Sequence, residues 1–103
     1  MTIKRYYWLK LYKDFFNDDL IKNLKKKDRG YTYIVIYTKL LLLSLEDEGH
    51  LFFESVEDSF NEELALKIDE DPTDVKTTVE YLIDKGLLEI KADDEYFFKL
   101  NIW

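Results

Sequence analysis

The feature that most constrains the fold is a long apolar segment in the middle of the chain. It reads YTYIVIYTKLLLLSLED from Tyr31 to Asp47. The segment is too long for one strand, is shorter than the ~20 residues needed to span a bilayer, and ends in Glu-Asp-Glu-Gly, which is typical of a helix end. We predict one long central helix. Because it is apolar on nearly every side, this domain or a second chain must cover it, which suggests self-association.

Composition limits the chain to one compact unit. With 103 residues, of which 47% are apolar and 17% aromatic, it can build one core and not two, so we expect a single domain over residues 1–103. The sequence has no cysteine, which excludes a disulfide scaffold, a thiolate zinc site and a cysteine nucleophile. Its first residues lack the apolar run of an export signal, so we expect a cytoplasmic protein.

Helical periodicity predicts three further helices. The first follows an extended lead-in at Tyr6–Leu11, is capped by Asn17, runs to about Lys27 and carries lysines opposite its apolar residues. The next spans Phe60–Ile68. In the last, Asp71 and Pro72 start a helix that runs to Lys85 and stops at Gly86.

Three short β-prone runs complete the pattern. HLFFE at His50–Glu54 predicts a short extended piece, and Leu87–Lys91 and Tyr96–Leu100 predict a hairpin around the polar turn Ala92–Glu95. The order is therefore helix, short strand, helix, helix and hairpin, with an extra helix in front. This order predicts a mainly α (α+β) fold, a winged helix-turn-helix with an extra N-terminal helix and a C-terminal β-hairpin wing.

The net charge of −7 hides a strong asymmetry. Up to Arg29 the chain has nine Lys and Arg against four Asp, which gives +5. From Gly30 onward six Lys oppose eighteen Asp and Glu, which gives −12. Because a basic segment attracts polyanions and an acidic one repels them, the two parts predict different partners.

Three long pieces of the sequence resemble a known family. They are YYWLKLYKDFF, YIVIYTKLLLLSLEDEGHLFFE and EELALKIDEDPTDVKTTVEYLIDKGLLEI, and the likeness spans roughly Arg5 to Ile90. They resemble the N-terminal domain of phage replisome organisers, which are relatives of the DnaD-like primosome proteins of Gram-positive bacteria and their phages. The resemblance implies a winged-helix replication-initiation domain, with no catalysis, that forms the N-terminal part of a longer protein in the bacterial host cell. In the DnaD-like relatives this domain is associated with oligomerisation.

The basic part supplies the first candidate for DNA binding. We expect Lys22, Lys25, Lys26, Lys27 and Arg29 to form a patch with Lys4 and Arg5 that contacts phosphates without reading the base sequence. The alternative is that these lysines are only the solvated face of an amphipathic helix.

The helix that would enter a major groove is a weaker candidate. Its outward-facing positions are predicted to be Thr73, Asp74, Lys76, Thr77, Glu80, Tyr81, Asp84 and Lys85. Three acids oppose two lysines there, and the wing turn Asp93–Glu95 is also acidic, so phosphates would be repelled. Groove insertion by Lys76, Thr77 and Tyr81 remains open beside a solvated or partner-facing helix.

Aromatic residues could stack on single-stranded bases, but most are expected in the core or in an interface. The set comprises Tyr31, Tyr33, Tyr37, Phe52, Phe53, Tyr96, Phe97, Phe98 and Trp103. Phe52 and Phe53 are neighbours in an extended segment and should point to opposite faces, so we expect at least one of them to seek a partner outside the core.

No catalytic or metal-binding pattern emerges. His50 is the only histidine, we interpret Glu62, Glu63 and Asp69–Asp71 as helix-end capping residues, and no phosphate-binding glycine loop is present. We therefore expect no cofactor, no metal and no enzymatic activity.

These observations lead to one hypothesis and two rivals. We expect an origin-associated assembly domain that touches DNA, self-associates, contacts replication proteins such as a helicase or its loader, and does not interact with membranes. The first rival is a sequence-specific winged-helix transcriptional regulator. The second is a purely protein-binding module that docks a helicase or loader.

Overall fold

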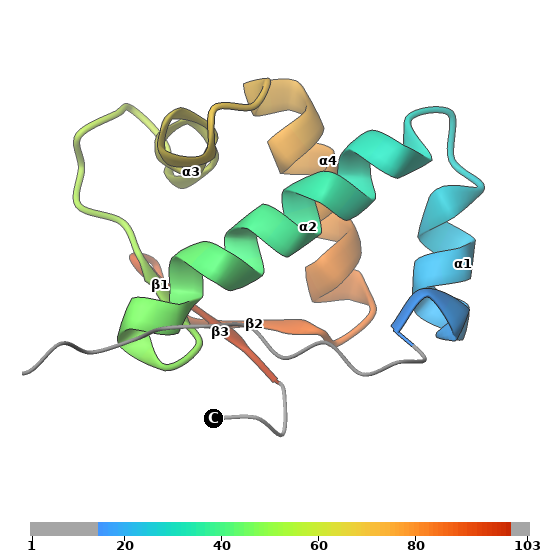
Figure 1. The fold of residues 1–103 in the computed structure, drawn as a ribbon. Helices are drawn as coiled ribbons and strands as arrows, with labels where there is room; N and C mark the ends of the chain where they lie inside the picture. The colour runs from blue at the N-terminus through green and yellow to red at the C-terminus, as the bar shows by residue number, and fades with distance from the viewer. Residues whose placement is uncertain (1–14, 100–103) are drawn as a thin grey trace, which may run out of the picture.

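The long apolar segment forms a helix around which the other elements gather. The computed structural model describes residues 15–99. In chain order the helices and strands are α1 (Asp19–Lys25), α2 (Gly30–Ser44), β1 (His50–Phe52), α3 (Phe60–Ile68), α4 (Pro72–Asp84), β2 (Leu88–Ala92) and β3 (Glu95–Phe98), with short 3₁₀ turns η1 (Phe15–Asn17) and η2 (Leu45–Asp47). Figure 1 shows α2 crossing the molecule, with α1 at its beginning and β1 at its end. The mainly α fold with a C-terminal hairpin is confirmed.

The central helix α2 is shorter than predicted and is covered on most sides. It ends at Ser44 and continues as η2, and Glu48 then turns the chain with a left-handed backbone (φ 53°). Its buried side chains face α1, α3, α4 and β1. An apolar stripe stays open, because Tyr31, Val35 and Leu42 are 69%, 46% and 49% exposed. Their spacing of four and seven residues places them on one side of the helix.

Side-chain caps explain where the other helices begin. Asp18, and not the predicted Asn17, caps α1 by accepting the N–H of Leu20, because Asn17 belongs to the preceding 3₁₀ turn η1. Ser59 caps α3, which was not predicted. Asp71 caps α4 directly before Pro72, as predicted. The lead-in predicted at Tyr6–Leu11 lies outside the described residues.

The three strands form one antiparallel sheet in the order β1-β3-β2. The hairpin is present, but its turn contains only Asp93 and Asp94, since β2 extends to Ala92 and β3 begins at Glu95. An irregular register between Ile90 and Ala92 accommodates this tight turn. The predicted end of the last strand, Leu100, lies beyond the described part. Because β1 and β2 are the edges, each has one side without a strand neighbour in the described residues.

Aromatic rings join the sheet to the helices. Phe60 of α3 stacks between Phe53 and Tyr96, at centroid distances of 5.5 and 4.1 Å. Burial raises the pKa of Tyr96. Phe98, two residues after Tyr96 and so on the same face of β3, has its ring centroid 5.9 Å from that of Tyr37 of α2. These contacts confirm that most of the aromatic residues described belong to the core, and they fix the sheet beneath the end of α2.

Candidate nucleic-acid interface

The helix α1 presents lysines to solvent because its apolar side faces the core. Ile21 and Leu24, three residues apart, are buried. Lys22, Lys25, Lys26 and Lys27 are exposed, and we call these four residues the lysine face. No carboxylate within residues 15–99 forms an ion pair with any of them. Their charge is therefore available to a ligand.

Two of these ammonium groups lie over aromatic rings. Lys25 Nζ is 5.4 Å from the ring centroid of Tyr31, and Lys27 Nζ is 5.4 Å from that of Tyr81. A ring quadrupole attracts a cation without neutralising it. The rings therefore orient the lysines and leave their charge unpaired.

Gly30 sets the angle between α1 and α2. A Cβ atom at this position would lie 2.2 Å from the carbonyl oxygen of Lys25, and backbone cannot move aside as a flexible side chain could. Only glycine allows the first turn of α2 to approach α1 so closely. The lysine face is thereby held beside the beginning of α2.

Arg29 binds a carboxylate instead of standing free. Its Nε and Nη2 donate to Asp74 Oδ1 and Oδ2 at 2.8 and 2.7 Å, a bidentate pair that ties the α1–α2 turn to α4. The hydrogen bond to Asp74 and its negative charge raise the pKa of Arg29. The outward orientation predicted for Asp74 is wrong, because its side chain is buried under Arg29. A phosphate at Arg29 would have to compete with Asp74.

Tyr81 cannot enter a DNA groove from its place in the structure. It was predicted to face outward, yet it is only 7% exposed, and its hydroxyl donates to the carbonyl oxygen of Leu20 at 2.6 Å. Burial, together with the nearby charges of Asp18 and Asp84, raises the pKa of Tyr81. This side chain joins α4 to α1, which is the physical reason why it faces inward.

The remaining outer face of α4 is poorly suited to phosphate. Lys76 is exposed, and Thr77 is half-buried with its hydroxyl donating to the carbonyl oxygen of Thr73. Lys85 has Asp84 beside it at 3.8 Å, and Glu80 is exposed. The charges of this face roughly cancel. Lys4 and Arg5, which were predicted to extend the basic patch, lie outside the described residues.

The other end of the molecule is acidic. Its exposed or half-buried carboxylates come from η2, from the loop between β1 and α3, and from the hairpin turn: Glu46, Asp47, Glu54, Glu57, Asp58, Asp93, Asp94 and Glu95. The loop and the hairpin turn touch, since Phe53 N–H donates to the carbonyl oxygen of Asp94 at 2.8 Å. We call this region the acidic end.

A buried carboxylate organises this loop. Glu63 of α3 is 1% exposed and accepts the backbone N–H groups of Glu54, Val56 and Glu57 at 2.7, 2.6 and 3.4 Å. Burial by itself would raise the pKa of Glu63, but these three bonds and the charge of Lys67 outweigh it, so the pKa is lowered. The predicted place of Glu63 at a helix end is confirmed, since it lies in the first turn of α3, but its contacts with the loop backbone were not predicted.

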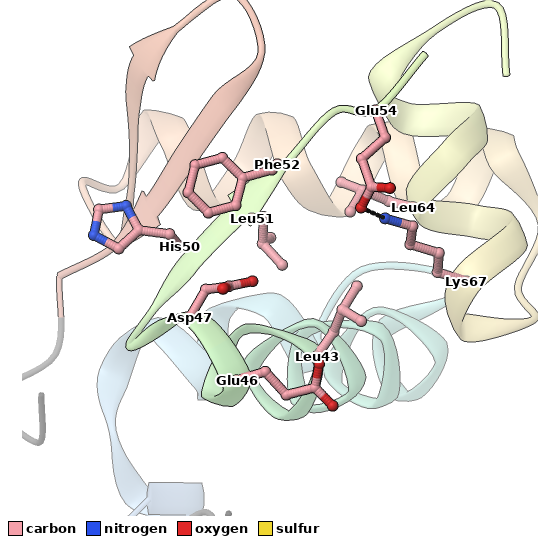
Figure 2. A pocket seen from close by; sticks show the side chains of 9 residues that line it. All are labelled: Leu43, Glu46, Asp47, His50, Leu51, Phe52, Glu54, Leu64 and Lys67. Atoms are coloured by element: carbon pink, nitrogen blue, oxygen red, sulfur yellow. Dashed lines mark hydrogen bonds and ion pairs between the residues drawn. The ribbon is translucent and has the colours of Figure 1, made fainter. Parts of the chain in front are cut away.

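A small pocket opens at the acidic end. Figure 2 shows its lining side chains: Leu43, Glu46, Asp47, His50, Leu51, Phe52, Glu54, Leu64 and Lys67. Its volume is about 100 Å³, below the ~300–1,000 Å³ that a cofactor or substrate pocket needs. The predicted strand-end histidine, His50, has Nδ1 2.6 Å from Oε2 of Glu95. Phe52 is 42% exposed whereas Phe53 packs on the core, so the predicted split between the two is confirmed.

The comparison with known families decides the identity. The family described as the N-terminal phage replisome organiser matches the chain over residues 8–103. The chain belongs to this family. No curated protein and no solved structure matches it. The replisome organiser domain therefore has a role connected with phage DNA replication.

Residues 15–99 of the replisome organiser domain contain neither a candidate membrane-spanning helix nor a candidate metal cluster. None of its described helices has the length and hydropathy to cross a membrane. In the same residues no three His, Asp or Glu side chains are grouped so as to hold a metal ion. Asp69 and Asp71 lie instead at the end of α3 and the beginning of α4.

The sequence pattern missed the two polar contacts that shape both ends of the replisome organiser domain. The pair of Arg29 with Asp74 joins residues 45 positions apart, and periodicity gives no information about such a distant contact. A signal for Glu63 did exist, because it is spaced four residues from Lys67 and directly precedes the apolar run Leu64–Leu66. That position already places its side chain near the inner side of α3.

Proposed function

We propose that this domain is a winged helix that touches origin DNA through the backbone phosphates and helps to assemble replication proteins there. One observation carries the DNA contact: the four charges of the lysine face have no carboxylate partner in the described residues. Phosphate neutralisation supplies most non-specific DNA affinity. The element order, with α3 and α4 followed by a hairpin, supports the winged-helix interpretation.

In this proposal α4 does not read bases. The side chains of Asp74 and Tyr81 are committed to other contacts, and the charges of the outer face of α4 cancel. The acidic hairpin turn, which corresponds to the wing, would be repelled by phosphates. Binding is therefore expected to depend on salt and hardly on base sequence.

Self-association is the second part of the proposal. The stripe of Tyr31, Val35 and Leu42 on α2 leaves apolar surface in water, and beside it a shallow depression of about 380 Å³ is lined by Leu42, Leu43 and Ile68 with the stems of two lysines. Exposed apolar stripes on a helix are typical of protein interfaces. We propose that this surface, together with the edges of the sheet, contacts a second copy or a helicase or loader. The domain would act without a cofactor and without catalysis.

The test measures DNA affinity of the chain at several salt concentrations, on origin-like and scrambled duplexes. Replacing Lys25, Lys26 and Lys27 by Gln should weaken binding equally on both duplexes and lower the salt slope by about 2.7, since each phosphate contact contributes about 0.9. Lys91→Gln is the control, because Lys91 is exposed on β2 and its Nζ lies 3.3 Å from Oε2 of Glu89. A sequence-specific regulator would instead prefer one duplex, and a purely protein-binding module would show no salt-sensitive binding. Preference for one duplex would refute recognition through the backbone phosphates alone, and the absence of salt-sensitive binding would refute the DNA contact.

A further inference from the structure

We propose that the pocket at the acidic end takes up a lysine side chain from the lysine face of a second copy, so that copies associate head to tail. This contact extends the self-association proposed above, at a surface distinct from the apolar stripe of α2. It does not depend on DNA binding.

The pocket has the shape and lining that a lysine requires. Its volume of about 100 Å³ suits one unbranched side chain better than a folded ligand. Leu43, Leu51 and Leu64 form an apolar floor, on which the methylene stem of a lysine can pack while its ammonium group remains at the rim. The exposed ring of Phe52 forms a wall against which a cation is favourable.

The rim is negative. Glu46, Asp47 and Glu54 line the pocket, and within the described residues Glu46 and Asp47 form no ion pair. The one ammonium group there, Lys67 Nζ, is 3.2 Å from Glu54 and 3.7 Å from the buried Glu63. The two carboxylates offset its charge. The end of α2 also lies at this rim, where the helix dipole favours a cation.

The lysine face that matches the pocket is on the same chain, but it lies too far from the pocket to enter it. α1 precedes α2 and the pocket lies at its other end, as Figure 1 shows. The 15 residues of α2 span about 22 Å, far more than the length of a lysine side chain. The lysine face of one copy must therefore meet the pocket of another. Such a head-to-tail contact is heterologous and continues into a ring or an open chain.

This contact predicts a competition. The lysine seated in a neighbour's pocket is unavailable to phosphate, so DNA and the next copy would compete for it. Added duplex should then lower the mass of the assembly, in proportion to the occupied lysine faces. Salt should weaken both contacts, because both are electrostatic.

The experiment uses two charge-reversed variants of the whole chain, with mass in solution measured at low and high salt. K25E/K26E reverses two of the four charges of the lysine face, and E46K/D47K reverses two charges of the rim. All four side chains are exposed, so circular dichroism should show both variants folded. We expect the wild type to associate at low salt, each variant alone to be smaller, and an equimolar mixture to form a complex. In that mixture one variant supplies the lysines and the other the pocket.

Controls separate this contact from general charge effects. E80K/D84K makes the same charge change as E46K/D47K on α4, far from the pocket, and should associate like the wild type. Phe52→Ala should weaken the contact about two- to fivefold. A wild type that is monomeric at low salt, variants that associate unchanged, or a mixture without a complex would each overturn the proposal. DNA binding of E46Q/D47Q, which removes the two rim charges without adding cations and retains the lysine face, tests the proposed function separately.

Discussion

The two ends of the molecule carry opposite charges and are held in place by different kinds of contact. At the basic end, lysines project from a helix that is fixed by a close backbone approach at Gly30 and by the pair of Arg29 with Asp74. At the acidic end, carboxylates project from a loop whose backbone hydrogen-bonds to Glu63. The basic end therefore depends on steric fit and on an ion pair, and the acidic end depends on one buried carboxylate. The two should respond to different perturbations.

The largest effect is expected from adding a side chain at Gly30. In Gly30→Val, the new Cβ would overlap the carbonyl group of Lys25, so α1 must move away from α2. We expect a loss of about 3 kcal/mol in the free energy of unfolding, at the upper end for overpacking. Urea denaturation measures this. Gly86→Ala is the matched control, because that position has open space and only a positive φ of 75° to strain it. Equal losses in the two variants would contradict the steric account.

Lowering the pH should have a smaller and more local effect on stability, confined to the loop at the acidic end. The folded pKa of Glu63 lies below its ordinary value of 4.5, so its carboxylate stabilises the fold above that value. This contribution is lost as the pH falls through the folded pKa. Hydrogen exchange should then accelerate in the loop between β1 and α3 before it does in α1.

Two variants check the assignment to Glu63. Glu63→Gln should remove this acid transition, whereas Glu62→Gln, which changes an exposed neighbour, should retain it. If α1 and the loop lost protection at the same pH in the wild type, the two ends would not be independent.

Substitutions on the exposed face of α4 should have a still smaller effect, on the salt slope of DNA binding. Lys76→Gln removes one exposed lysine from a face whose charges roughly cancel, so the salt slope of DNA binding should fall by well under the ~0.9 of a full phosphate contact. Thr77→Ala should leave any preference between duplexes unchanged. Fluorescence anisotropy on two duplexes measures both. If Lys76→Gln lowered the salt slope as much as Lys25→Gln does, α4 would again be the candidate for the helix that enters the DNA groove.

The smallest change in stability is expected at Leu42. Leu42→Ser alters a half-exposed side chain, so the free energy of unfolding should stay within about 0.5 kcal/mol of the wild type. Association that persists at high salt should nevertheless decrease, because the stripe on α2 loses apolar surface. Sedimentation at two salt concentrations distinguishes this from the electrostatic contact. If only the low-salt association decreased, the stripe would not be an interface.

The sequence predicted the elements well because their signals are local. Apolar spacing located α1, α3 and α4, and the Asp71-Pro72 pair fixed the beginning of α4. The predicted ends of the helices were less accurate where several neighbouring residues could act as the cap. Asn17 and Asp18 are both good caps, and the choice between them depended on the turn η1, which leaves no trace in the periodicity.

The candidate site was predicted only in part. The exposure of the four lysines follows from the amphipathic pattern of α1. The burial of Tyr81 and Asp74 does not, because both reach partners on the α1 side of the fold, more than forty positions earlier in the chain. Helical spacing assigns residues to a face of α4 but cannot say that α1 covers part of that face. The pocket likewise combines η2, β1 and α3, which only the folded chain brings together.

The bidentate pair of Arg29 with Asp74 should restrict which substitutions this domain can accept during evolution. Its two members come from separate segments, and its geometry needs both the planar guanidinium and a carboxylate of this length. A lineage that loses one member is left with an uncompensated charge against α4, so we expect positions 29 and 74 to co-vary. Second-site suppressors of damage at one of them should therefore map to the other.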